Sequence, residues 1–266
     1  MNTRALKTLA TAALMTMTLA ACSTGGDTTE LEGGEKVVEK GKLTVCTHLP
    51  YQPFEFNEDG KVVGFDIDLM DLVAKDLGLE QKVFDTPFEG IQSGQSLNTS
   101  KCDVAAAGMT ITDTRAKVID FSDPYFNATQ ALLVKKDSGI STLEDLAGKS
   151  LAVQDGTTGA IYAEENAPED TEIRSFEDLA LLETAVATGQ VDAGINDNGV
   201  LYDYVNDHPK LAVPTEFDTG EQYGFAVAKD KNDALLETIN DVLAKAKEDG
   251  TYDEIYKKWF GETPKG

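Results

Sequence analysis

The chain has 266 residues, of which 41% are hydrophobic and 26% charged, so it is long enough to bury one large core or two modest ones. Its formal net charge is −24, which excludes nucleic acid as a partner because phosphate binding needs a basic surface. The acidity otherwise indicates a well-solvated surface and says nothing about the choice of a small ligand.

The N-terminus has the pattern of an export signal. Two basic residues precede an apolar, threonine-rich span over 9–20, which is too short to cross a membrane and is followed by a cleavage-like site. We therefore expect residues 1–21 to be a signal peptide. The following Leu-Ala-Ala-Cys, ending at Cys22, is typical of a lipobox, in which the cysteine carries lipid; an unlipidated secretory peptide is the alternative. Residues 22–36 are rich in glycine, threonine and acids, which predicts a flexible tether to the outer face of the cytoplasmic membrane.

The rest of the chain has two similar halves. Gly41-Lys42 and Gly148-Lys149 each introduce a short apolar strand that ends in a polar, threonine-bearing turn. Later in each half a polar turn and an aspartate, Asp103 or Asp192, introduce a further strand. Strands that alternate with helical stretches predict parallel βαβ units, and the duplication predicts two α/β lobes. Because open sheets of this kind bind ligands at the carboxyl ends of their strands, two facing lobes would form a cleft.

The chain is predicted to cross between the lobes twice. Extended connections leave a discontinuous first lobe, 37–127 plus 224–266, around a second lobe, 128–223. Two crossings would restrict the motion between the lobes to a bend, as a closing cleft requires.

Capping residues mark two of the expected helices. Asp66 is expected to cap a helix whose apolar stripe ends before Gly78. The capping-box pair Ser141 and Glu144 predicts a short helix over 142–147.

The C-terminal region is predicted to form two further helices, over 234–247 and from Thr251 onward. Aromatic residues recur at helical spacing in the second of them. Such a stripe is more typical of core packing than of a ligand platform.

Residues 103–126 hold the most informative motif. A short apolar strand from Asp103 ends in Gly108 and Thr110, and a helix is expected to start at Thr112. Arg115 then lies beside free backbone N–H groups, and its planar guanidinium can bind a carboxylate through two hydrogen bonds. The motif predicts a small-anion clamp, although an arginine that merely decorates a first helical turn is the simpler interpretation of the motif alone.

Two cysteines remain after Cys22. Cys46 lies near the end of the first strand and Cys102 lies just before the strand that begins at Asp103. An even pair in an exported protein suggests a disulfide, and the two strands are expected to be neighbours. The cysteines fall toward opposite ends of those strands, so two buried free thiols are the alternative. The pair is too sparse for a metal site.

Four motifs in unbroken order within residues 41–262 carry a family resemblance. They are YQPFEF, VVGFDIDL, DVAAAGMTITDTRAKVIDFSDPYF and INDNG. Together they resemble the polar amino-acid family of extracellular solute-binding proteins that serve ABC importers. The resemblance implies a type II periplasmic-binding-protein-like fold, with two lobes, each a mostly parallel sheet with flanking helices, joined by a two-strand hinge. It also implies a monomer without cofactor or metal that captures a polar L-amino acid and delivers it to a membrane permease.

The resemblance assigns the carboxylate end of the ligand site. By position in that family, Arg115 would pair with the ligand carboxylate, helped by the Gly108 backbone and by Thr110. The second lobe would close over the carboxylate with Thr157 and Thr158, at a turn where a helix begins.

The same resemblance assigns the rest of the site. Asp197 would take the ammonium, although a helix N-cap is its alternative role. Tyr51 and Phe88 would sandwich the aliphatic part of the ligand. Side-chain choice would rest on His48 and Gln154, with Asn196 as a further candidate. Family members for basic amino acids carry an acid at the His48 position, so this histidine argues against lysine or arginine and favours glutamine or glutamate; a rim histidine without ligand contact is the alternative.

No reaction centre is predicted. The chain lacks a G-x-S-x-G elbow, an H-E-x-x-H pair and a phosphate-cradling glycine loop. Two alternatives would share the fold, an exported cyclohexadienyl dehydratase acting on prephenate or arogenate, and a ligand sensor for a membrane receptor.

Overall fold

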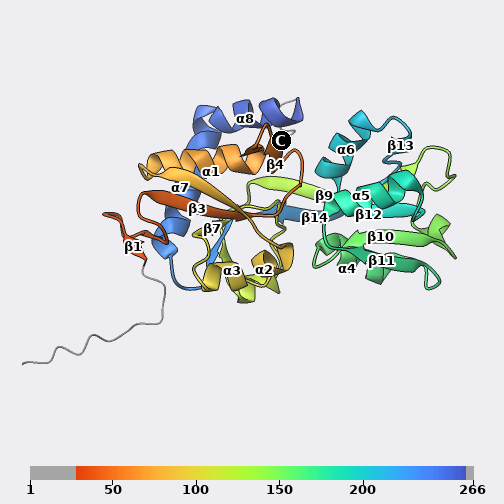
Figure 1. Ribbon diagram of the computed structural model, residues 1–266, viewed down its shortest axis with the longest axis horizontal. Coiled ribbons are helices and arrows are strands. Elements are labelled where there is room, and N and C mark those ends of the chain that lie inside the picture. Colours follow the sequence, from red (N-terminus) through yellow and green to blue (C-terminus); the bar gives the residue numbers. More distant parts are fainter. Residues whose placement is uncertain (1–27, 262–266) are drawn as a thin grey trace, which may run out of the picture.

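A computed structural model of the protein describes residues 28–261 (Figure 1). The expected signal peptide and the lipidation site at Cys22 lie outside these residues. Within them no helix combines the length and the apolar character needed to span a bilayer. Two lobes lie side by side, each built on one sheet with helices on both faces (Figure 1).

The first lobe is built on a five-stranded sheet in the order β6-β3-β7-β15-β8. β3 is parallel to both of its neighbours, whereas β15 is antiparallel to β7 and β8. Five of the six residues of β3 are buried, as a central strand covered on both faces requires. The strands are β3 (Lys42–Thr47), β6 (Glu80–Asp85), β7 (Val104–Ala105), β8 (Ile119–Phe121) and β15 (Ala226–Ala228).

Helices divide between the two faces of this sheet. One face packs against α1 (Phe65–Asp76), α7 (Asp233–Asp249) and α8 (Thr251–Phe260), and the other against α2 (Phe88–Gln92) and α3 (Gln95–Asn98) (Figure 1). Aromatic residues of α8 pack into the core, as expected: Phe260 meets Phe54, Phe65 and Phe126 with ring centroids 5.3 to 5.4 Å apart. A small hairpin, β4 (Phe56–Glu58) and β5 (Lys61–Val63), precedes α1.

The second lobe is built on the sheet β11-β10-β12-β9-β13, in which β14 also pairs with β9. β10 is parallel to β11 and to β12, whereas every pair that includes β9 is antiparallel. The strands are β9 (Phe126–Lys135), β10 (Ser150–Gln154), β11 (Glu172–Phe176), β12 (Ala193–Asp197), β13 (Leu211–Ala212) and β14 (Glu216–Tyr223). The flanking helices are α5 (Leu179–Thr188) and α6 (Asn198–Asp207) on one face and α4 (Thr158–Asn166) on the other.

β9 and β14 form the connection between the lobes (Figure 1). They pair with each other along most of their length, so the two crossings make a single antiparallel ribbon. A ribbon of two strands bends more easily than the wide sheets on either side of it, and this places the hinge between the lobes.

Four local predictions differ from the structure, and the first two concern the tether and the cap of α1. Residues 28–36 were expected in the tether, but β1 (Thr29–Glu30) pairs with β2 (Lys36–Val37), and the Lys36 amide donates to Asn232 Oδ1 at 3.0 Å. Asp66 does not cap α1, because Gly64 holds the N-cap position and the Asp66 side chain is buried.

Two expected helices are single 3₁₀ turns. Thr112 Oγ1 accepts the Arg115 N–H at 3.2 Å, but the turn η1 (Arg115–Lys117) ends at once because β8 follows. The turn η2 (Glu144–Leu146) replaces the helix over 142–147, and Asp145, not Glu144, accepts the Ser141 and Thr142 amides.

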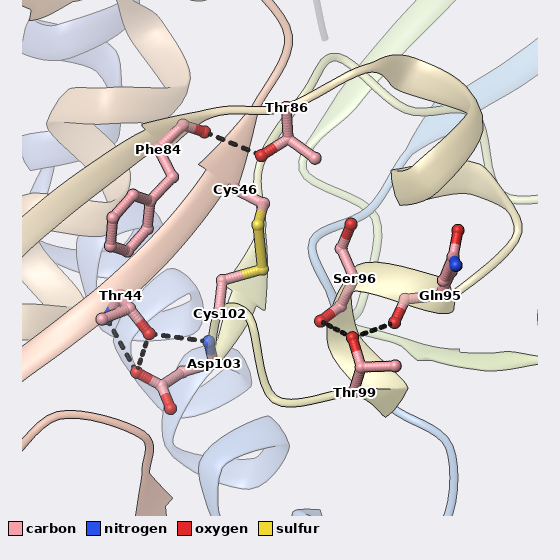
Figure 2. Close-up of a disulfide and its surroundings, with 9 residues drawn as sticks. All are labelled: Thr44, Cys46, Phe84, Thr86, Gln95, Ser96, Thr99, Cys102 and Asp103. Carbon is pink, nitrogen blue, oxygen red and sulfur yellow. Dashed lines mark hydrogen bonds between the residues drawn. A yellow bond between two sulfur atoms is a disulfide. The ribbon is translucent and has the colours of Figure 1, made fainter. Parts of the chain in front are cut away.

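Cys46 and Cys102 form a disulfide (Figure 2). Their Cα atoms lie 5.8 Å apart, although the two residues are 56 positions apart in the chain. The segment before β7 does not continue along β3 but turns beside it, where the Asp103 carboxylate accepts the Thr44 amide at 2.7 Å. This turn removes the separation that the strand positions alone suggested.

Candidate functional site

A pocket lies between the two lobes. All ten ligand-contact residues predicted from the sequence line it, and Ala107 is the one lining residue that was not predicted: the set is His48, Tyr51, Phe88, Ala107, Gly108, Thr110, Arg115, Gln154, Thr157, Thr158 and Asp197. Many of these positions follow the carboxyl ends of parallel strands. His48 comes after β3, Gln154 ends β10 and Asp197 ends β12. Such strand ends are where open α/β sheets bind ligands.

Arg115 is buried at the first-lobe wall of the pocket. One of its terminal nitrogens, Nη1, donates to the Thr110 carbonyl at 2.7 Å, and Nη2 donates across the cleft to the Gly156 carbonyl at 2.9 Å. Its guanidinium carbon also lies 5.3 Å from the centre of the Phe88 ring. Burial lowers the pKa of Arg115 from its ordinary value, while the charges of Asp197 and Glu221 oppose the shift. A guanidinium has five N–H donors, so this cation keeps donors for a ligand carboxylate.

Asp197 is a buried acid in the second-lobe wall. Its carboxylate accepts the Tyr51 hydroxyl at 2.8 Å, the Gln130 amide at 2.5 Å and the Tyr223 hydroxyl. Burial, followed by the negative charge of Glu221, raises the pKa of Asp197 to about 6. Asp197 holds the N-cap position of α6, but its side chain makes no capping hydrogen bond. Because these three donors are neutral, the ionised carboxylate suits a ligand cation such as an ammonium.

The Gly108 backbone is held by a hydrogen bond to Asp66, a buried residue beneath the pocket lining. Its N–H donates to Asp66 Oδ2 at 3.0 Å, so the carbonyl oxygen is the polar group that remains for a ligand. A carbonyl accepts hydrogen bonds, and Gly108 therefore suits the ammonium and not the carboxylate to which the sequence analysis assigned it. Only glycine fits here, since φ is +49° and a Cβ would lie 2.6 Å from Tyr51 Cε1. Burial raises the pKa of Asp66 to about 7.

The three threonines at the carboxylate end have partners for their hydroxyls. Thr110 and Thr158 both donate to Glu221 Oε2 at 2.7 Å. Thr157 caps α4, donating to the Gln154 carbonyl at 2.7 Å and accepting the Ala160 N–H at 3.1 Å. The start of α4 can still offer backbone N–H groups to a carboxylate, because the amides of the first helical turn have no acceptor inside the helix.

Two more polar side chains of the pocket lining, His48 and Gln154, have defined orientations. His48 Nδ1 lies 3.1 Å from the Thr86 carbonyl, which can only accept, so Nδ1 carries a hydrogen. In the neutral ring this leaves a lone pair on Nε2, which is buried and has no hydrogen-bond partner among the described residues. His48 as a whole is half-buried, and it is the Nε2 atom that is removed from solvent.

A hydrogen-bond chain orients Gln154. The Asp197 N–H donates to Asn196 Oδ1 at 2.8 Å, so Asn196 Nδ2 is the atom that donates to Gln154 Oε1, at 3.1 Å. Within residues 28–261 the Gln154 Nε2 group has no hydrogen-bond partner. The pocket lining thus includes an acceptor, Nε2 of a neutral His48 ring, and a donor, the Gln154 amide.

Three residues around the site were not predicted from the sequence: Gln130, Glu221 and Tyr223. All three lie on the connecting strands β9 and β14, which the sequence analysis treated only as links. Two signals were available. Gln130 is a polar residue directly before the apolar run 131–134. Glu221 and Tyr223 are two positions apart, so they share one face of a strand.

The chain was compared with known proteins. It is 43% identical over 211 residues to the ABC transporter glutamine-binding protein GlnH of Bacillus subtilis, an alignment that covers 77% of this chain and 75% of that protein. Among solved structures, an ancestral arginine-binding protein bound to glutamine has 42% identity and a TM-score of 0.78, and the match covers 84% of this chain and 100% of that one. The ancestral amino acid-binding protein AncCDT-1, described as a precursor of cyclohexadienyl dehydratase, has 40% identity and a TM-score of 0.77, with 83% of this chain and 96% of that one covered.

The sequence model of one family matches residues 43–262, which is most of the chain and includes every residue that lines the pocket. The protein belongs to the bacterial extracellular solute-binding proteins, family 3.

Proposed function

We propose that the pocket binds a free L-amino acid and that the protein delivers it to the membrane permease of an ABC importer. The observation that carries this proposal is that one pocket holds a buried arginine and a buried aspartate as its two charged lining residues. Arg115 and the N-terminal amides of α4 suit an α-carboxylate, and Asp197 with the Gly108 carbonyl suits an α-ammonium. Tyr51 and Phe88 supply apolar area between the polar groups. The glutamine-binding and arginine-binding relatives support the same class of ligand.

Among amino acids, we favour glutamine over glutamate. A carboxamide has one donor group and one acceptor, which match the His48 Nε2 lone pair and the Gln154 amide. A glutamate carboxylate has acceptors only and would face the lone pair of His48 in a buried site. An arginine side chain would bring a second cation into the pocket, whose acidic lining residue, Asp197, is assigned to the α-ammonium.

Capture requires the two lobes to close. Tyr51 and Arg115 belong to the first lobe, whereas Thr158 and Asp197 belong to the second, so the complete set of contacts exists only when the lobes meet. A ligand that bridges them stabilises the closed form by its extra contacts in that form. The closed form would then dock on the permease, with a monomer held at the outer face of the membrane by lipid on Cys22.

The test is a binding measurement on the purified protein without residues 1–21. At a ligand concentration of 100 times Kd, binding adds about 2.7 kcal/mol, and a chain of this size moves in Tm by about 2 to 4 °C per kcal/mol. We expect the largest shift with glutamine and a Kd for glutamate at least about tenfold higher. No shift with any of the twenty amino acids would refute the amino-acid proposal. Equal affinity for glutamate would refute only the preference for a carboxamide.

A pair of histidine variants separates His48 from a general effect. His48→Phe keeps a ring beside Phe88 but removes the acceptor, so the affinity for glutamine should fall about tenfold. His208 is the other histidine of the chain, and it stacks on Tyr204 at a centroid distance of 3.8 Å, outside the pocket lining. His208→Phe should bind glutamine as the unaltered protein does.

A dehydratase is the second candidate, favoured by the similarity to the precursor of cyclohexadienyl dehydratase. A carboxylate-binding arginine would serve that reaction as well as amino-acid binding. Turnover of prephenate or arogenate by the purified protein would establish it, and we expect none.

A further inference from the structure

Glu221 is an acid that bonds to residues of both lobes but does not line the pocket. It lies on β14, and its two carboxylate oxygens accept four hydrogen bonds. Oε2 accepts the hydroxyls of Thr110, in the first lobe, and of Thr158, in the second, each at 2.7 Å. Oε1 accepts the Thr219 hydroxyl at 2.9 Å and the Gln130 amide at 3.1 Å. The Glu221 side chain thus forms hydrogen bonds with residues of both lobes.

The position of Glu221 in the strand places it at the hinge. On the second-lobe side, Phe217 pairs with Gln130, and beyond the interruption Glu221 pairs with Ala128. The three residues 218–220 therefore face only residue 129 of the partner strand. Extra residues of this kind break the ladder and let a strand bend and twist locally. Glu221 is the first paired residue after this bulge, on the side that leads back to the first lobe.

The two threonine bonds depend on closure. Thr110 follows β7 in the first lobe, and Thr158 begins α4 in the second. Their hydroxyl oxygens lie 3.4 Å apart, because both donate to the same carboxylate oxygen. A bend at the bulge that separates the lobes must move Thr158 away from Thr110, and one oxygen can then no longer accept from both.

We propose that Glu221 is a latch for cleft closure, a positioning residue that stabilises the closed arrangement by accepting one hydroxyl from each lobe. It is connected to the ligand site, since the Gln130 amide that donates to Glu221 also donates to Asp197 at 2.5 Å. The proposal rests on the closing cleft described above, but it does not depend on which ligand the cleft binds.

Glu221→Gln tests the latch with little change in shape. The variant keeps one oxygen but replaces the other by an amide nitrogen, which cannot accept, so the shared site for the two hydroxyls is weakened. The matched control is Glu216→Gln, on the same strand. Glu216 accepts from Thr129 at 2.7 Å, Asn198 at 3.0 Å and Tyr202 at 2.5 Å, which lie on β9 and α6 and include no partner from the first-lobe sheet or its helices.

The measurement is small-angle X-ray scattering of each protein, without and with saturating glutamine, together with the Kd. We expect ligand-free Glu221→Gln to have a larger radius of gyration than the unaltered protein and a Kd about tenfold higher. Glu216→Gln should change neither. Saturating glutamine should return Glu221→Gln to the closed radius, which shows that the variant is folded.

Two results would overturn the latch. One is a ligand-free radius and a Kd for Glu221→Gln equal to those of the unaltered protein. The other is an equal change in Glu216→Gln, which would assign the effect to lost charge on the strand. If no amino acid binds, the proposed function fails, and the ligand-free radii still decide the latch.

Discussion

Acidification below pH 6 should weaken ligand binding through Asp197. Burial and the charge of Glu221 raise the pKa of this carboxyl to about 6, and an ammonium binds to the ionised form. The ionised fraction is about 90% at pH 7 and about 10% at pH 5, so Kd should rise about tenfold between these values, which is about 1.4 kcal/mol.

Isothermal titration calorimetry with glutamine from pH 5 to pH 8 measures this dependence. Glutamine suits the assay because its side chain has no titrating group. Asp197→Asn should bind more weakly at pH 7 and lose most of the pH dependence. The control is Asp123→Asn, which alters an exposed carboxylate that does not line the pocket. A pH dependence that survives in Asp197→Asn would refute the assignment and point to Asp66, whose pKa of about 7 titrates in the same interval.

The stability of the unliganded protein should change with the opposite sign. The folded pKa of Asp197 lies above the ordinary value of 3.8, so between about pH 4 and 6 the folded state binds more protons than the unfolded state. This group alone therefore makes the folded protein about 3 kcal/mol less stable at pH 7 than below pH 4. Acidification from pH 7 to pH 5 should raise the contribution of Asp197 to the unliganded Tm while it reduces the shift that glutamine produces.

Two further predictions concern stability. Burial, followed by repulsion from Asp203 and Asp178, raises the pKa of Glu183 to about 8, so Glu183→Gln should raise the free energy of unfolding at pH 7 by about 3 kcal/mol in urea titrations. The gain should vanish at pH 4, where the acid is protonated in both states, and an equal gain there would contradict the reasoning. Replacing Cys46 and Cys102 together by alanine should lower the free energy of unfolding by about 4 kcal/mol, because the disulfide closes a loop across 56 positions. A loss below about 1 kcal/mol would show that the loop entropy of the unfolded chain is not what the bridge restricts.

The sequence was a good guide to which residues meet at the pocket. Each candidate follows a strand or begins a helix, and the carboxyl ends of parallel strands converge whatever the details of packing. Gln154 and Asp197 illustrate this, since they end neighbouring strands of one sheet. The family resemblance then selected among the polar residues at those ends.

The sequence was a poor guide to the hydrogen-bond partners of polar residues in and around the pocket. Asp66 was expected to cap its own helix, a local role, but a buried carboxylate gains more from the Gly108 amide, 42 positions away, and from the Tyr125 hydroxyl. Thr110 was expected to help bind the ligand carboxylate through its amide or hydroxyl, and its hydroxyl donates to Glu221, 111 positions away. Bonds over such separations depend on the packing of the two lobes, which no local pattern contains.

The place of β15 in the first sheet has a consequence for the order of folding. This strand lies between β7 and β8, and it is β15 that pairs with β8. During synthesis every strand of the second sheet emerges before residue 226, whereas the first sheet lacks an inner strand until then. The half of the chain that is made first is therefore the half that finishes folding last, and the last residues to be made complete it.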